Sequence, residues 1–204
     1  MSDFPKARGL YTSAALDGSE TLVAYYDSID GDVRFARVDN AGAASVAVVD
    51  GDGQNGHRNG DVGRFPAVAQ VGDELLVVYE DFTRHELRAW RGATPGSDGA
   101  FTTVDAGKET GDPGKRFVGA GTRVVVEGTS PLVVYQDASN LDLKMARGSD
   151  TGWQPERLIE QGAHGFYSDV ALSDGTAFIV SVIAELDSRG RERSRVGLTL
   201  RSFP

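Results

Sequence analysis

The sequence has no cysteine, only two methionines and two tryptophans, and no long apolar run. Without cysteine, disulfides and thiolate chemistry are excluded, and the compartment stays open. No segment approaches the roughly 20 apolar residues of a membrane helix, and residues 1–5 lack the basic start and apolar stretch of a secretory signal, so we expect no membrane insertion. Cations are also scarce: 21 Lys and Arg against 30 Asp and Glu give a net charge of −9, which argues against a nucleic-acid partner.

Glycine is abundant instead. The 26 glycines are spread along 204 residues, of which 40% are hydrophobic. Glycine at many separate places is typical of tight turns between short strands. The chain is also long enough to bury a core of its own.

Four segments of similar sequence divide the chain. Each has an apolar strand, a polar turn and a second strand that ends in arginine. The apolar strands cover residues 22–27, 76–81, 132–137 and 178–183, and the arginines are Arg37, Arg91, Arg147 and Arg201. These arginines are 54, 56 and 54 residues apart. Such a period indicates a repeat architecture.

A further strand precedes each hairpin and begins with an aromatic residue followed by small ones. The aromatic residues are Tyr11, Phe65, Phe117 and Tyr167. Small residues suit innermost strands that crowd around an axis. An outer strand follows in three of the repeats, at residues 45–49, 101–104 and 156–159, and is missing from the last.

We therefore predict an all-β fold, a propeller of four four-stranded blades that forms one domain over residues 1–204. The predicted blades cover about 9–50, 63–106, 115–161 and 165–204, and residues 3–8 supply the outer strand of the last blade and close the ring. Two alternatives stay open. The chain is half of a larger propeller completed by another chain, or a fragment of a longer one.

The hairpins resemble the blades of sialidase-like propellers. Residues 133–147 show the pattern, with Val-Val-Tyr-Gln-Asp, a polar turn and Asp-Leu-Lys-Met-Ala-Arg. The turns at 97–101 and 149–153 are similar to shortened Asp-boxes, and the resemblance implies that Asp98 and Asp150 cap backbone amides. It also favours an extracellular or cell-envelope location. The arginines, tyrosine and acids of a sialidase-like active site are not assignable to positions of this sequence.

Strand order places the connections between blades and the hairpin turns on one rim, where a rigid scaffold can present a ligand site. Seven polar residues of this rim are the predicted ligand-binding residues: Asp27, Arg64, Asp81, His85, Arg116, Asp137 and His164. The alternative, which we favour for the aspartates, is that each caps its own turn or pairs with an arginine of the neighbouring blade. The three histidines, His57 included, have no metal-ligand spacing.

Three further sequence features have a chemical or structural interpretation. Asp50, Asp52 and Asp61 place oxygens at alternate positions as calcium loops do, although the segment departs from the EF-hand pattern at Asn55 and Asp61, so calcium is a weak expectation. Tyr25, Tyr79 and Tyr135 are expected to pack in the core between blades. The basic hairpin tip at residues 189–193 is expected to be solvated, with docking of an acidic partner as the alternative.

From these observations we expect a non-enzymatic module that binds a protein or a glycan with this rim, as a monomer or small oligomer, with no cofactor except the possible calcium. The first alternative is a sialidase-like glycoside hydrolase, which requires a deep central pocket where an acid with a raised pKa faces a second carboxylate. The second alternative is a structural subunit that completes a larger propeller with another chain.

Overall fold

The computed structural model describes residues 6–96, 99–108, 114–159, 162–187 and 189–202. The regular secondary structure of the described residues consists of strands, which form four antiparallel sheets. In these residues no helix is long and apolar enough to cross a membrane. The predicted all-β propeller fold is confirmed.

Each sheet is a meander of consecutive strands. The first sheet contains β1 (Arg8–Asp17), β2 (Glu20–Asp27), β3 (Asp32–Val38) and β4 (Ala44–Asp50). The second contains β5 (Val62–Val71), β6 (Glu74–Asp81), β7 (Glu86–Gly92) and β8 (Ala100–Asp105). The third contains β9 (Val118–Glu127), β10 (Ser130–Asp137), β11 (Asp142–Ser149) and β12 (Gly152–Ile159). The fourth contains β13 (Ala163–Ser173), β14 (Thr176–Leu186) and β15 (Glu192–Ser202).

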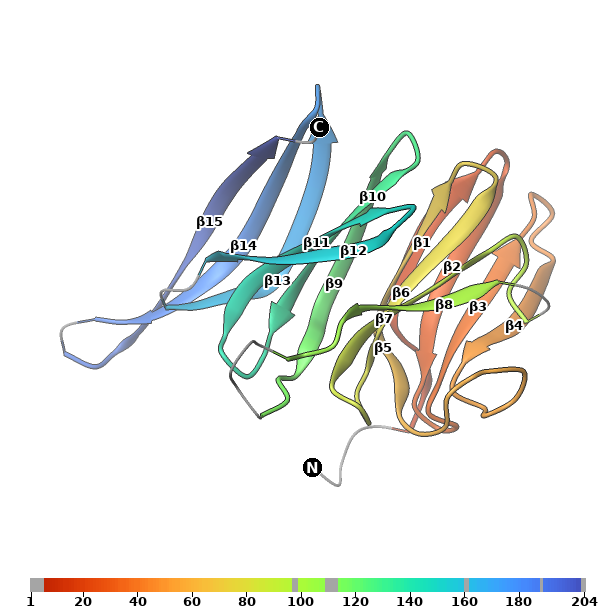
Figure 1. The fold of residues 1–204 in the computed structure, drawn as a ribbon, viewed down its shortest axis with the longest axis horizontal. Coiled ribbons are helices and arrows are strands. Elements are labelled where there is room, and N and C mark those ends of the chain that lie inside the picture. The colour runs from red at the N-terminus through yellow and green to blue at the C-terminus, as the bar shows by residue number, and fades with distance from the viewer. Residues whose placement is uncertain (1–5, 97–98, 109–113, 160–161, 188, 203–204) are drawn as a thin grey trace.

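The sheets stack face to face in chain order, as Figure 1 shows from the first sheet at one end to the fourth at the other. The innermost strands pack in the same order, β1 on β5, β5 on β9 and β9 on β13. Strand β6 is covered on both faces, because Val77 and Tyr79 pack toward the first sheet while Leu76 and Val78 pack toward the third. Burial on both faces explains why these strands are continuous apolar runs.

The arc of sheets is not closed by the N-terminal segment, and this differs from our prediction. Arg8 pairs with Asp27 in the first sheet, and the N–H of Ser28 donates to the carbonyl of Ala7 at 3.0 Å. An ion pair of 2.9 Å between Arg8 Nε and Asp27 Oδ2 holds the segment there. Residues 3–5 lie outside the described residues, and the fourth sheet has three strands in the part that is described.

The arginine repeat is exact in three sheets and displaced in the fourth. Arg37, Arg91 and Arg147 lie directly opposite Leu22, Leu76 and Leu132. In the fourth sheet Leu200 takes this place, opposite Phe178, and Arg201 is one residue further along. Because neighbours on a strand point to opposite faces, Arg201 is not equivalent to the other three.

Candidate functional site

Each innermost strand contains a β-bulge near its start. Pairing with the second strand of the sheet shifts between Leu10 and Ser13 and at the matching places of β5, β9 and β13. One residue in each bulge is left-handed: Tyr11 (φ 52°), Phe65 (φ 49°), Gly121 (φ 63°) and Tyr167 (φ 49°). This conformation is unfavourable for a bulky side chain, so three aromatic residues at one place of the repeat point to a functional constraint.

A glycine with positive φ lies two residues before each left-handed position, at Gly9, Gly63, Gly119 and Gly165. At Gly63 a Cβ atom would lie 2.4 Å from the Cβ of Val33, so a larger residue would collide with the preceding sheet. The Gly-X-aromatic pattern is a sequence signal of the bulge that we did not use in predicting the site.

The pattern corrects the predicted alignment of the third repeat. The residue equivalent to Tyr11 is Gly121 and not Phe117. Phe117 precedes β9 and stacks on His85, with ring centroids 3.6 Å apart. The third sheet therefore contributes no aromatic side chain at this place.

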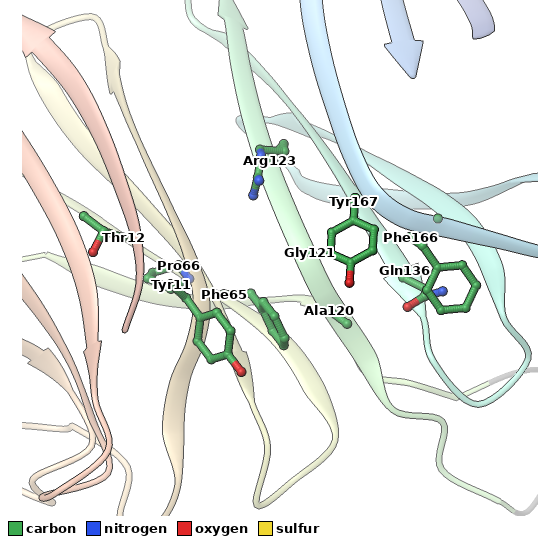
Figure 2. Close-up of a pocket in the computed structure, with 11 residues that line it drawn as sticks. Tyr11, Thr12, Phe65, Pro66, Ala120, Gly121, Arg123, Gln136, Phe166 and Tyr167 are labelled. Carbon is green, nitrogen blue, oxygen red and sulfur yellow. The ribbon is translucent and has the colours of Figure 1, made fainter. Parts of the chain in front are cut away.

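The four left-handed residues border one pocket of about 380 Å³ near the axis of the arc. Its other lining residues are Thr12, Pro66, Ala120, Arg123, Gln136, Gly165 and Phe166. Figure 2 shows Tyr11 beside Phe65 on one side of β9, and Tyr167 on the other with Phe166 and Gln136. The ring centroids of Tyr11 and Phe65 are 4.1 Å apart. Tyr167 is 88% exposed to solvent. The bulges thus present aromatic faces to a ligand-sized space.

Polar groups in the pocket wall are few. Arg123 and Thr12 line it, and Gln136 lines it while its Nε2 donates to the carbonyl of His164 at 2.6 Å. A largely apolar pocket with a few fixed polar groups is the usual composition of a small-molecule site. Aromatic faces with neighbouring hydrogen-bonding groups suit a sugar ring, which has both apolar C–H faces and hydroxyls.

Glu80 occupies the position in the second sheet that Gln136 occupies in the third, as their pairing with Arg64 and Ala120 shows. Its side chain is only 4% exposed, and the backbone of Gly119 passes close to it. Burial raises the pKa of Glu80 to about 7, against the opposing effect of Arg64 and with smaller contributions from Asp61 and Asp81. The charge of Glu80 also acts on the pKa of Tyr11, a pocket residue.

Arg64, one of the predicted rim residues, is held by a cluster beside Glu80. Its Nε donates to Asp61 Oδ1 at 3.1 Å, its Nη2 pairs with the other oxygen, and its guanidinium lies 3.5 Å over the ring of Phe82. The hydroxyl of Tyr26 donates to Asp61 Oδ1 at 2.7 Å. Burial, followed by this hydrogen bond, raises the pKa of Tyr26 well above its usual value. The cluster fixes a cation next to the buried acid.

The predicted rim aspartates are fully buried and bond within their own turns. Asp27 accepts the N–H of Ile29, and Asp137 accepts the N–H groups of Ser139 and Asn140, all at 3.0 Å. Asp81 accepts the N–H of Arg84 and pairs with Arg58. This geometry corresponds to the structural alternative for these residues.

The remaining predicted rim residues are also dispersed. His85 stacks on Phe117, the N–H of Arg116 donates to the carbonyl of Gly107, and His164 is buried with its N–H on the carbonyl of Leu141. None of the seven predicted residues lines the axial pocket. Their role in ligand binding stays a prediction.

The three aspartates predicted for calcium each have donors from the protein. Asp50 is buried and accepts from the hydroxyl of Tyr79 at 2.7 Å and the N–H of Arg58 at 2.6 Å. Asp52 Oδ1 lies 2.6 Å from Nδ1 of His57, and Asp61 binds Arg64 and Tyr26. Within the described ranges, no three His, Asp or Glu side chains gather as a metal would require. The three aspartates do not form one ligand group in this part of the chain, because each is hydrogen-bonded to a different part of the loop.

The turn that resembles an Asp-box is held by serine. Ser149 Oγ accepts the N–H of Thr151 at 3.3 Å and donates to the carbonyl of Gly152 at 3.1 Å. The capping group at this turn is therefore Ser149 and not Asp150. Asp98 lies outside the described residues.

The fold is shared with several solved glycoside hydrolases. The catalytic domain of a GH62 α-L-arabinofuranosidase of Coprinopsis cinerea matches 100% of this chain and 70% of its own (TM-score 0.57, 14% identity). A thermostable family-43 glycoside hydrolase matches 95% of this chain and 68% of its own (TM-score 0.61, 12% identity). A family 117 glycoside hydrolase of Zobellia galactanivorans matches 97% of this chain and 69% of its own (TM-score 0.57, 13% identity). No family model and no curated protein sequence matches the chain.

These likenesses correct our functional prediction. We expected a non-enzymatic module, whereas the three solved structures named above, which share the fold, are glycoside hydrolases. The expectation of a binding module depended on charged rim residues such as Asp27 and Asp137, whose carboxylates accept hydrogen bonds within their own turns. The pocket at the bulges of the innermost strands is lined by none of the seven predicted rim residues.

Proposed function

We propose that the protein is a glycoside hydrolase that takes a sugar ring in the axial pocket. The observation that supports this most is the repeated left-handed bulge, which directs Tyr11, Phe65 and Tyr167 into one pocket despite its conformational cost. The shared fold with glycoside hydrolases supports the same conclusion.

In this proposal the aromatic rings stack on the sugar, and Arg123, Thr12 and Gln136 provide hydrogen bonds to its hydroxyls. Aromatic stacking contributes about 1 kcal/mol per contact, so several rings are needed to hold a weakly apolar ligand. Tyr167, which is highly exposed, would lose most solvent on binding.

Hydrolysis of a glycosidic bond requires a carboxylic acid that gives its proton to the leaving oxygen, and a second carboxylate. Glu80 is our candidate for the acid, because its pKa of about 7 keeps it largely protonated below neutral pH. No carboxylate is among the residues that line the pocket. In this proposal the proton therefore comes from Glu80, which is not a lining residue but whose charge acts on the pocket residue Tyr11. Asp61, whose charge acts on Glu80, is the candidate second carboxylate.

The test is release of nitrophenol from p-nitrophenyl α-L-arabinofuranoside and a panel of other p-nitrophenyl glycosides by the purified chain. We expect Tyr167→Ala to raise KM about tenfold through lost stacking. We expect Glu80→Gln to lower kcat at least about 100-fold through loss of the proton donor.

Matched controls are Leu198→Ala, an exposed apolar residue of the fourth sheet, and Glu74→Gln, which lies at the other end of β6. Both controls should leave kcat and KM unchanged. Absence of hydrolysis across the panel, or equal rates for Glu80→Gln and Glu74→Gln, would contradict the proposal.

A further inference from the structure

Two of the three contacts between neighbouring sheets contain the same polar group of three residues, which we term the interblade latch. An aspartate at the end of an outer strand accepts the hydroxyl of a tyrosine and pairs with a cation of the next sheet. Asp50 Oδ2 accepts the hydroxyl of Tyr79 at 2.7 Å and pairs with Nε of Arg88 at 2.9 Å. Asp105 Oδ2 accepts the hydroxyl of Tyr135 at 2.7 Å and pairs with Nζ of Lys144 at 2.5 Å. All six residues are buried.

The third contact lacks all three members of the latch. Strand pairing places Ile159 where the aspartates lie, since Asp50, Asp105 and Ile159 pair with Val33, Leu87 and Leu143. Ser181 and Gly197, which pair with each other, take the places of the tyrosine and the cation. The three residues are thus present together or replaced together, as expected for groups that neutralise one another in the interior.

The first sheet has the tyrosine and the cation without the aspartate. Tyr25 pairs with Arg34 as Tyr79 pairs with Arg88. Leu22 and Ala24 pack in the core shared with the second sheet. Alternation along β2 therefore directs Tyr25 to the opposite face, which no described sheet covers.

The arginine of this incomplete latch turns to its own sheet. Arg34 pairs with Asp27 at 3.0 Å and with Asp30 at 2.9 Å. Its side chain is 20% exposed, against 9% for Arg88 and 10% for Lys144. No hydrogen bond to the hydroxyl of Tyr25 is formed within the described part of the chain.

The apolar frame around Tyr25 matches a face that is covered elsewhere in the molecule. Val23 and Ala36, which pair with each other, correspond to Val133 and Ala146, which also pair. Val133 and Ala146 are buried in the core between the second and third sheets. The same residues on the first sheet therefore form a surface suited to another sheet of this repeat.

We propose that the outward face of the first sheet binds a further blade of the same repeat, carried by a polypeptide segment outside residues 8–202. The outermost strand of that blade ends in an aspartate that takes the hydroxyl of Tyr25 and the guanidinium of Arg34, as Asp50 and Asp105 do for their partners. The fourth sheet of a second copy fits less well. Its uncovered face bears Phe178, Val180, Leu198 and Leu200, and its outermost described strand, β15, contains no aspartate.

The test adds the missing neighbour to the whole chain. Residues 62–117, the second blade and its following connection, are duplicated directly ahead of Arg8, because Arg8, Val62 and Val118 are equivalent first residues of β1, β5 and β9. The added copy supplies its own Asp105. We expect amide hydrogen exchange at residues 20–38 to slow at least about tenfold relative to the natural chain.

Variants separate the latch from general stabilisation. Tyr25→Phe, or Asp105→Asn in the added copy only, should reverse much of this slowing, whereas Tyr25→Phe in the natural chain should change nothing. Unchanged exchange at residues 20–38, including the case in which the added copy remains unfolded, would overturn the proposal. A natural chain that self-associates and whose self-association is weakened by Tyr25→Phe would also overturn it, because a second copy would then occupy the face.

Discussion

Two contacts between neighbouring sheets differ in the residues at equivalent positions. One lies between the second and third sheets, and the other lies between the third and fourth. The former buries Asp105, Tyr135 and Lys144 in a hydrogen-bonded group. The latter has Ile159, Ser181 and Gly197 at the same positions. Glu80 and Gln136 extend the contrast, since an acid in one contact corresponds to a neutral amide in the next.

The difference shows that the latch is not a requirement of the fold. A buried ion pair contributes little net stability compared with apolar residues of similar size, but removal of a single partner is costly. A latch is therefore replaced as a whole or retained as a whole. The charged contact should accordingly respond to single substitutions and to pH, and the neutral contact should not.

The largest expected effect is the loss of one latch member. Asp105→Ala leaves the ammonium of Lys144 and the hydroxyl of Tyr135 buried without their acceptor, so the free energy of unfolding should fall by about 3–5 kcal/mol. Urea unfolding measures this change. Adding Lys144→Met to Asp105→Ala should restore part of the loss, and the comparison would fail if the second substitution made the protein less stable still.

The next effect concerns pH and Glu80. Because burial raises its folded pKa to about 7 from the usual 4.5, the folded chain binds the proton more tightly than the unfolded chain. The stability contribution of this proton is complete below about pH 4.5 and is lost as the pH rises to about 7, by up to about 3 kcal/mol. Glu80→Gln should therefore stabilise the protein at pH 8 relative to the wild type and leave it little changed at pH 4.5. Urea unfolding at both pH values tests this, and a benefit confined to the lower pH would show that the sign is wrong.

The smallest effect compares single hydroxyls. Tyr79→Phe removes one buried hydrogen bond to Asp50 and should lower the free energy of unfolding by about 1 kcal/mol. Ser181→Ala, at the same position of the fourth sheet, should change it by less than about 0.5 kcal/mol. Thermal unfolding of both variants is sufficient, and equal losses would remove the distinction between the two kinds of contact.

The sequence allowed the repeat, the strand-rich fold and the burial of Tyr79 and Tyr135 to be predicted. Regularly spaced apolar runs indicate strands directly, because a strand that is buried on both faces is a continuous run of apolar residues. The N-terminal segment was misplaced because strand pairing across the chain depends on contacts such as that of Arg8 with Asp27, which have no local signature.

The candidate site was harder to predict than the fold. Charged loop residues such as Asp27 and Asp137 look available in a sequence, but their own turns supply donors that saturate them. The pocket residues look like ordinary strand residues instead, because only the backbone angles of Tyr11, Phe65 and Tyr167 reveal the bulge. The Gly-X-aromatic repetition was visible and would have separated Phe117 from this set.

The bulge of the innermost strands frees one side chain per sheet from the alternation that governs the rest of the strand. Tyrosine, phenylalanine and glycine already occupy this place in different sheets without altering the strand order or the contacts between sheets. Single substitutions there therefore change the lining of the pocket while the hydrophobic layers remain as they are.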